Sequence, residues 1–295
     1  MKDLIFYILD VFADSKYAGN QLAVVRSGDK LTDKQMQCIA NEMHFSETSF
    51  ILSEEEKNGG YPVRIFTLVS ELPFAGHPTL GTAFAIQQEI IKKKVEKIVL
   101  NLKVGPIPVT FIYHNNFPEL LWMQQNPPSF GCQFQAEKVA RALNLKVGDF
   151  DAEFPVMEVS TGSPTLIAPL KTLEAVKRAR SNQEFFYDLV KNVEAKTILF
   201  FAPETYDREN QLHVRFFADC LGVPEDPATG SANGCLAAYL VKCRYFGKDN
   251  IDIRVEQGHE IDRPSRLYLK ADESYSKFNI NVGGKVFMIA RGRFE

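Results

Sequence analysis

The sequence contains two copies of a strand–loop–helix pattern, separated by about half the length of the chain. The first copy runs from the β-rich residues 63–67, through a loop with Gly76 and Pro78, into small apolar residues. The second runs from residues 214–217, through a loop rich in Pro and Gly, into the apolar residues 236–241. Short β-branched and aromatic runs between polar boundaries indicate strands. This repeat constrains the chain to form two similar halves.

Each loop ends where a helix is predicted to begin. A helix N-terminus has unpaired N–H groups and a partial positive charge, which favour an anion such as a carboxylate. Gly76 lets a ligand approach the backbone, and Pro78 suits the first turn of a helix. Two such loops facing each other form one cleft with two helix N-termini directed into it. For either loop alone, a tight turn into a buried helix remains the alternative.

The composition argues against a nucleic-acid-binding, membrane-spanning or secreted protein. A length of 295 residues is typical of two domains. With 34 Lys and Arg against 37 Asp and Glu, there is no basic field to favour nucleic acid. No apolar run reaches the length of a membrane span, and Met1-Lys-Asp-Leu lacks the features of a signal peptide. The 5 cysteines are scattered, which is typical of a reduced protein, so we expect a cytoplasmic location.

The predicted elements contain more strands than helices and no strict βαβ alternation, which indicates an α+β fold. Thr32 and Gln35 form a capping-box pattern at the start of a helix that ends near Met43. The Pro- and Gly-containing segment 126–131 is the candidate linker. The other predicted helices follow the two loops or lie at 135–143, 173–179 and 184–193. The chain opens with two apolar runs, 4–11 and 21–25, joined by a turn-like link. Strands are predicted at 49–52, 63–67, 98–102, 107–113, 120–125, 157–160, 165–168, 197–202, 212–217, 251–257, 266–270, 278–282 and 286–291, with the set from 98 to 125 antiparallel.

Four polar residues are candidates for chemistry, and each has a simpler explanation. Glu47 lies between a helix and a strand, where active-site residues often occur, but most glutamates are on the surface. His77 lies between Gly76 and Pro78, but a histidine can also cap a helix. Asp226 and Ser231 can also be helix caps. No metal-binding spacing, phosphate loop or nucleophile elbow is present, so neither a metal site nor a serine nucleophile is supported.

Five stretches, spread over nearly the whole chain, resemble the PhzF family. These are phenazine-biosynthesis-type isomerases with the diaminopimelate epimerase-like fold. The matching stretches are residues 19–25, 46–50, 64–67, 71–79 and 225–234. The resemblance implies two pseudo-symmetric domains, each a β-barrel-like sheet around a central helix, with the active site between them. It places the N-terminal domain at 1–127, with the strand 283–295 returning to it, and the C-terminal domain at 128–282.

The resemblance also implies site residues. Glu47 takes the place of the family's acid/base glutamate, and His77 and Asp226 take those of its histidine and aspartate. Residues expected to bind the substrate are Gly76 and Gly230 through their amides, Ser231 and Asn20. The implied activity is a cofactor-free, metal-free isomerisation of a small carboxylate-bearing metabolite by a homodimer.

Two groups of residues depart from relatives of the family. Ala75 and Thr229 occupy the positions where the epimerase branch has its two cysteines, which disfavours two-thiol racemisation. Gln21 and the pair 68–69 replace commoner proline-containing turns, which affects substrate fit more than mechanism. The alternatives to an isomerase are a lyase or hydrolase using Asp226 or Ser231, and a non-catalytic member that binds a small molecule or another protein.

Overall fold

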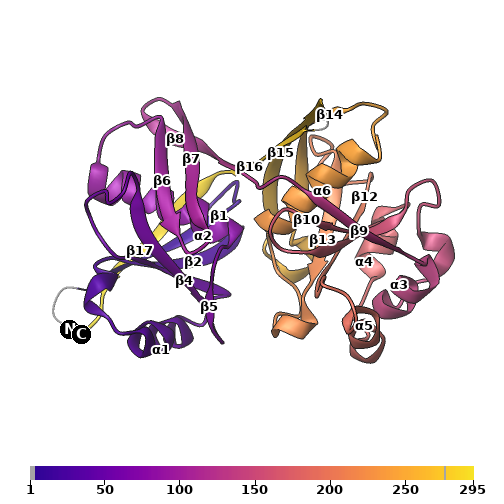
Figure 1. Cartoon of the computed structure of the whole chain (residues 1–295), viewed down its shortest axis with the longest axis horizontal. Coiled ribbons are helices and arrows are strands. Elements are labelled where there is room, and N and C mark those ends of the chain that lie inside the picture. The colour runs from indigo at the N-terminus through magenta and orange to yellow at the C-terminus, as the bar shows by residue number, and fades with distance from the viewer. Residues whose placement is uncertain (1–3, 276) are drawn as a thin grey trace. The chain divides into compact units, whose positions relative to one another are not determined.

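The computed structural model describes residues 4–275 and 277–295, so the first three residues of the opening Met1-Lys-Asp-Leu lie outside the described part. The chain divides into two compact units (Figure 1). Unit 1 comprises Met1–Gln124 and Gly283–Glu295, and unit 2 comprises Gln125–Val282. The first boundary lies three residues before the one expected from the sequence. Within the described residues, no helix is long and apolar enough to cross a membrane.

Unit 1 is a mixed sheet wrapped around one helix. Its strands pair in the order β17–β1–β2–β3–β4–β6–β7–β8, in which β2–β3 and β4–β6 are parallel and the other pairs antiparallel. The short β5 also pairs with β4. The strands are β1 (Ile5–Val11), β2 (Asn20–Val25), β3 (Glu47–Ile51), β4 (Tyr61–Thr67), β5 (Glu71–Leu72), β6 (Lys97–Leu102), β7 (Gly105–His114), β8 (Phe117–Gln124) and β17 (Val286–Arg293).

The central helix of unit 1 is α2 (Gly76–Ile86), and all of its residues are buried. It contacts β1, β2, β3, β6, β7, β8 and β17 (Figure 1). It continues into a π-helical turn, η2 (Gln87–Ile91). A helix that is apolar all round must be enclosed in this way. The second helix, α1 (Asp33–Met43), begins with the predicted capping box of Thr32 and Gln35 and packs on β3 and β4.

Unit 2 repeats this plan. Its strands pair in the order β9–β10–β11–β12–β13–β14–β15, with β11–β12 and β13–β14 parallel. The central helix α6 (Gly230–Lys242) contacts β10, β11, β14 and β15. The strands are β9 (Ser129–Phe134), β10 (Val156–Ser160), β11 (Thr165–Pro169), β12 (Ile198–Ala202), β13 (Leu212–Phe217), β14 (Asn250–Gln257) and β15 (Ser265–Ser274), and β16 (Lys277–Gly284) crosses the boundary at Val282.

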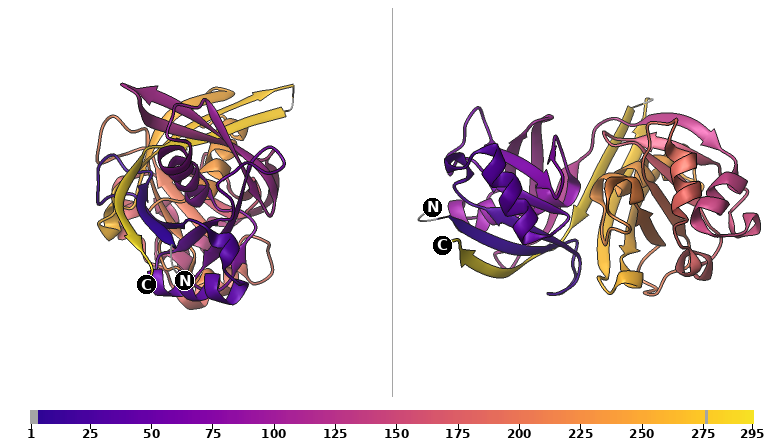
Figure 2. Two further views of the ribbon diagram at one scale, coloured as in Figure 1. Left: turned by 90° about the vertical axis from the view of Figure 1, so that its left-hand side faces the viewer. Right: turned by 90° about the horizontal axis from the view of Figure 1, so that it is seen from below.

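Unit 2 also has a layer of short helices that unit 1 lacks in its described part. They are α3 (Ala136–Leu143), α4 (Leu173–Arg178) and α5 (Gln183–Val190). Figure 2 shows them grouped away from α6, and they enclose a separate apolar core against β11 and β12. The single-turn helices are η1 (Gly28–Lys30), η3 (Val147–Asp149), η4 (Asp219–Leu221) and η5 (His259–Ile261).

The predicted α+β class and the antiparallel set at 98–125 are confirmed. The candidate linker at 126–131 extends too far along the chain, because β9 starts at Ser129 and pairs antiparallel with β10. The prolines at 127 and 128 stop the preceding strand, but they do not prevent the residues after them from forming a new one.

The same cluster of side chains packs around the strand of each repeat, β4 in unit 1 and β13 in unit 2. In unit 1, the Arg64 guanidinium lies 5.0 Å from the Phe66 ring centroid, and Phe66 packs edge-on against Phe50. In unit 2, Arg215 lies 4.9 Å from the Phe217 ring centroid, and Phe217 packs edge-on against Phe200. The sequence repeat therefore corresponds to a repeated packing unit and not only to similar strands.

Gly81 allows α2 to approach the sheet closely. A Cβ at this position would lie 2.5 Å from Leu22 Cδ2 and 2.9 Å from Val11 Cγ2. We expect Gly81→Val to lower the free energy of unfolding of unit 1 by about 1–3 kcal/mol, because it overpacks a dense core. Urea denaturation followed by the fluorescence of Trp122, the only tryptophan, which lies in β8, measures this. The control is Gly148→Val, which adds a side chain where no atom lies within 4 Å. Equal midpoints for the two variants would contradict the prediction.

Candidate functional site

In unit 1 the structure brings Glu47 and His77 together. Glu47 is the first residue of β3, and His77 is the second residue of α2. The Nε2 of His77 lies 3.5 Å from Oε2 of Glu47, and the two side chains are 5% and 17% exposed. Glu47 is therefore not a surface glutamate. The contact depends on the loop between β4 and α2, which places the first turn of the helix beside the start of β3.

Burial keeps the His77 ring neutral. It lowers the pKa of His77 to about 3, although a hydrogen bond to the Gln21 backbone acts in the opposite direction. Because Nε2 faces Glu47, the Gln21 bond involves the other ring nitrogen. The contact between His77 and Glu47 is therefore a polar contact with a neutral imidazole, not an ion pair. A neutral ring in this position can exchange a hydrogen bond with a carboxyl group or a bound molecule.

The other predicted residues of unit 1 lie nearby in the chain. Gly76 is the first residue of α2, and the cap residue Ala75 has an extended backbone and supplies no side-chain cap among the described residues. The first-turn amides therefore receive no hydrogen bond from a capping side chain. Asn20 begins β2, next to the Gln21 backbone that bonds His77, and is buried.

In unit 2 the corresponding loop holds Asp226. Its carboxylate accepts a hydrogen bond from the Thr229 hydroxyl at 2.5 Å, and its backbone N–H donates to the Phe216 carbonyl. The helix begins at Gly230, with Thr229 as its cap residue, and Ser231 is the second residue of α6. The idea that Asp226 or Ser231 serves as the helix cap is therefore wrong. Asp226 is 8% exposed, so its carboxylate is held inside the loop.

A pair of arginine–glutamate bridges supports the two loops. Arg64 donates two hydrogen bonds to Glu71, both at 2.8 Å, and Arg215 donates two to Glu225, at 2.8 and 2.7 Å. Each glutamate precedes the first glycine of its helix by the same number of residues. Planar bidentate contacts of this kind fix geometry as well as charge. Arg64 and Arg215 both lie in the repeated strand, so the sequence repeat itself carries the signal for these bridges.

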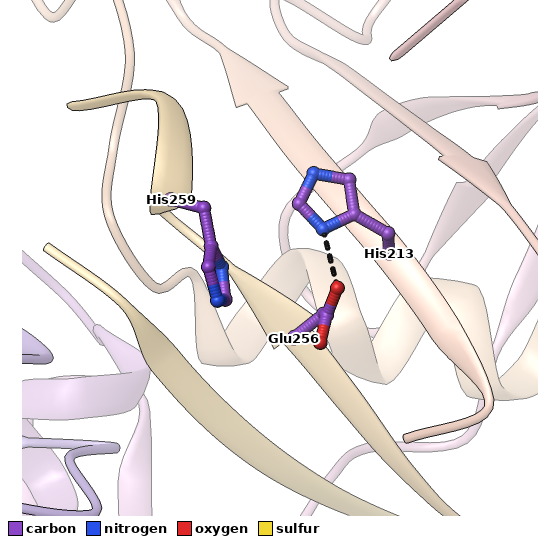
Figure 3. Close-up of side chains that lie close together, drawn as sticks. All are labelled: His213, Glu256 and His259. Atoms are coloured by element: carbon purple, nitrogen blue, oxygen red, sulfur yellow. Dashed lines mark hydrogen bonds and ion pairs between the residues drawn. The ribbon is translucent and has the colours of Figure 1, made fainter. Parts of the chain in front are cut away.

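Unit 2 also contains a buried charge network around His213 (Figure 3). The Nδ1 of His213 lies 3.0 Å from Glu256, and Nε2 lies 3.1 Å from Glu260. Burial alone would lower the pKa of His213, but the two carboxylates outweigh it and raise the pKa. Burial likewise opposes the ionised form of Glu256, yet hydrogen bonds from His213 and the backbone lower its pKa to about 2. The network is thus an imidazolium held between two carboxylates.

His213, Glu256 and His259 place possible ligand atoms within 4.8 Å of one another, which raises the question of a metal. Both nitrogens of His213 already contact carboxylates. The two oxygens of Glu256 also accept hydrogen bonds from the backbone at Tyr206 and Asp207 and from Asn210. A cation here would have to displace these bonds. The arrangement therefore fits an ion-pair network better than a metal centre.

The structure thus builds two half-sites. One contains Glu47 and His77 beside Gly76, and the other contains Asp226 beside Thr229 and Gly230. That the two share one cleft stays a prediction. The residues that sequence reasoning missed are those that hold the loops. They are Arg64 and Glu71 in unit 1, and Arg215, Glu225 and Gln257, which bonds the Asp226 carbonyl, in unit 2.

The chain was compared with known proteins. It matches the family described as "Phenazine biosynthesis-like protein" over residues 9–292. It is 32% identical to a trans-2,3-dihydro-3-hydroxyanthranilate isomerase of Pseudomonas aeruginosa, over 98% of both chains. It is 34% identical to an uncharacterised isomerase of Pasteurella multocida, over 97% of this chain and 92% of that one.

Solved structures agree on the fold. A PhzF-family phenazine biosynthesis protein of Bacillus anthracis superposes with a TM-score of 0.90 at 29% identity, covering 100% of both chains. A hydroxyproline epimerase of Agrobacterium vitis superposes with a TM-score of 0.66 at 9% identity, covering 99% of this chain and 90% of that one. At that identity the second match shows only that the fold is shared.

The two buried histidines are expected to show opposite protonation. Proton-coupled ¹⁵N spectra should show His77 neutral at pH 5 and His213 doubly protonated at pH 7, because burial dominates the first and carboxylates dominate the second. The variants His77→Gln and His213→Gln assign the signals. A protonated His77 at pH 5 would contradict this.

The lowered pKa of His77 also predicts a pH dependence of stability. The unfolded chain binds a proton near pH 6.5 and the folded chain only near 3, so this residue makes stability fall as the pH drops through that range. We expect His77→Gln to flatten the loss of stability in that range, measured by urea denaturation. The exposed His114→Gln is the control. An unchanged slope for His77→Gln would contradict the prediction.

Proposed function

The chain belongs to the phenazine biosynthesis-like (PhzF) family, and from that premise we propose that it is a cofactor-independent isomerase that moves a proton within a small carboxylate-bearing metabolite. The observation that carries the proposal is the contact between Glu47 and His77. A partly buried carboxyl group beside a neutral imidazole, next to a helix N-terminus, is suited to proton transfer on an anionic substrate.

In the proposed reaction, Glu47 is the acid/base. As the carboxylate it removes a proton from a carbon next to an unsaturated system, the electron pair shifts along that system, and the new carboxylic acid returns the proton to another carbon. The proton count of the substrate is unchanged, so no oxidant, reductant or second substrate is needed. A single group that alternates between base and acid can carry both steps.

The surrounding groups have supporting roles in the proposal. Neutral His77 exchanges hydrogen bonds with the substrate or Glu47 without adding a charge. The amides of Gly76 and Gly230, with Ser231 and Asn20, hold the carboxylate of the substrate, since donors placed in advance stabilise developing negative charge. Asp226 orients a polar group of the substrate. The relatives named as isomerases of an anthranilate support a carboxylate as the shared substrate feature.

A thiol mechanism has little support in this chain. The two positions that hold cysteines in the epimerase branch are Ala75 and Thr229. Cys235, in α6, is fully buried, and burial raises the pKa of its thiol to about 11, so it is a poor base. The other cysteines lie outside both half-sites. A homodimer and a cytoplasmic location, expected from the sequence, remain proposals.

The acid/base role predicts the effect of one substitution. Glu47→Gln keeps size and hydrogen bonding but removes the acid, so turnover should fall by about 100-fold or more while the fold is kept. The assay follows deuterium from D₂O into the migrated position of the substrate, beginning with trans-2,3-dihydro-3-hydroxyanthranilate and related carboxylates. The exposed Glu55→Gln is the control.

Two results would overturn the role of Glu47. One is full turnover of the Glu47→Gln variant. The other is loss of wild-type turnover when the accessible thiols are alkylated. Saturable binding of a substrate with no turnover by the wild type would favour the non-catalytic alternative.

Metal independence is a separate prediction. Dialysis against EDTA should leave turnover within about twofold of the untreated enzyme, because the proposed proton transfer uses only side chains and amides. Added Zn²⁺ or Mg²⁺ should not increase the rate. A rate that falls with EDTA and recovers with one added metal would contradict metal independence. It would support a metal site at His213, Glu256 and His259.

A further inference from the structure

Gln257 is the last residue of β14, and its side chain is completely buried beneath the loop that carries Asp226. Its amide makes four hydrogen bonds, all within unit 2. Nε2 donates to the Asp226 carbonyl at 2.8 Å and to the Thr229 hydroxyl at 3.3 Å. Oε1 accepts from the Thr229 backbone at 3.3 Å and from the Asn233 side chain at 3.0 Å. A glutamine amide has two donor hydrogens and two acceptor lone pairs, so its capacity is used in full.

This arrangement fixes the direction of the Thr229 hydroxyl. The Thr229 oxygen accepts a hydrogen from Gln257, so its own hydrogen must point to another acceptor. That acceptor is Oδ2 of Asp226, at 2.5 Å. Reversing the Gln257 amide would place its nitrogen against two donors and its oxygen against a carbonyl, so this orientation is the one that satisfies every partner.

The loop is held from both strands that flank it. The Asp226 N–H donates to the Phe216 carbonyl of β13, and its carbonyl accepts from Gln257 of β14. Its carboxylate accepts from Thr229, whose carbonyl in turn accepts from Asn233 in the first turn of α6. Hydrogen bonds of the Gln257 side chain therefore hold both the Asp226 loop and the start of α6.

Unit 1 has a different arrangement at the equivalent place. Ala75 replaces Thr229 there, and within the described residues of unit 1 the link into the helix is a hydrogen bond from the Thr79 hydroxyl to the Ala75 carbonyl. Leu72 stands where unit 2 has Asp226. The hydrogen-bond chain is therefore confined to the unit that carries the aspartate, which a purely structural role in the repeat would not require.

We infer that Gln257 is a positioning residue for the reaction, acting through the Thr229 hydroxyl to orient the carboxyl group of Asp226. The inference rests on the proposed function, in which Asp226 contacts the substrate. Hydrogen bonds donated to a carboxylate favour its charged form. Losing the Thr229 hydroxyl should therefore make Asp226 easier to protonate and less well ordered.

A matched pair of variants at Thr229 tests this. Thr229→Val keeps the shape and removes the hydroxyl, and Thr229→Ser keeps the hydroxyl and removes only a methyl group. The first readout needs no substrate: the titration midpoint of the Asp226 carboxyl, followed by ¹³C NMR and assigned with Asp226→Asn. Neither variant changes a charged side chain.

We expect the midpoint to rise by about one pH unit in Thr229→Val and to return to the wild-type value in Thr229→Ser. Turnover of Thr229→Val should fall roughly tenfold, mainly in kcat, and recover in Thr229→Ser. Gln257→Glu should act like Thr229→Val, because the new carboxylate accepts the Thr229 hydrogen in place of Asp226. Gln257→Met, which removes the amide without adding an acceptor, should raise the midpoint less than Thr229→Val does, because the Thr229 hydroxyl is present but no longer held toward Asp226. An unchanged midpoint in Gln257→Met would show that Gln257 does not position the hydroxyl.

An unchanged midpoint in Thr229→Val would overturn the inference, and so would equal shifts in Thr229→Val and Thr229→Ser, which would indicate packing alone. The titration of Asp226 tests this inference independently of the proposed function, because it needs no substrate. If Glu47→Gln keeps full turnover while the Thr229 variants shift the Asp226 midpoint as expected, the hydrogen-bond chain stands and the acid/base assignment fails.

Discussion

Each unit depends on enclosing one helix on all sides within its own sheet. The residues of α2 are all buried, and those of α6 nearly all. An enclosed helix must approach the strands closely, which explains the small residues in its first turns and the tight contact at Gly81. It also leaves the first-turn amides without capping side chains among the described residues, so the fold itself presents an amide group suited to an anion.

The loops that lead into these helices are held by charge. Arg215 is 3% exposed and, besides Glu225, donates hydrogen bonds to the carbonyls of Val176 and Ala179 at the end of α4. A buried guanidinium is tolerated only when its donors are satisfied, because an unpaired buried charge is costly. The equivalent Arg64 is more exposed and reaches the exposed Asp33 at the start of α1. The Arg215–Glu225 bridge, which supports the Asp226 loop, is thus the more buried of the two. Its loss should lower the stability of its unit more than loss of the Arg64–Glu71 bridge.

The sequence predicted the elements better than the contacts. Periodicity and capping signals placed α1, the antiparallel strands β6 to β8 and both central helices, because these depend on local patterns. The strand β9 was missed, because its pairing with β10 joins residues that no local pattern connects. Sequence patterns predict Gln257 only as the end of a strand. Its hydrogen bonds go to the Asp226 loop, which lies far from it in the sequence. The neutral state of His77 follows from burial, which a motif does not report.

The two units share a scaffold but differ at the position of the proposed acid/base, and this bears on the proposed mechanism. The strand registers pair Phe50 with Arg64 and Phe200 with Arg215, which aligns Glu47 with Thr197. Thr197 is buried and donates to Thr165, so it has no acid/base character. A reaction that removes a proton on one face of a carbon and adds one on the other needs two similar acid/base groups. A reaction that removes a proton and returns it to the same molecule needs a single acid/base, and Glu47 with no equivalent group at Thr197 fits that second case.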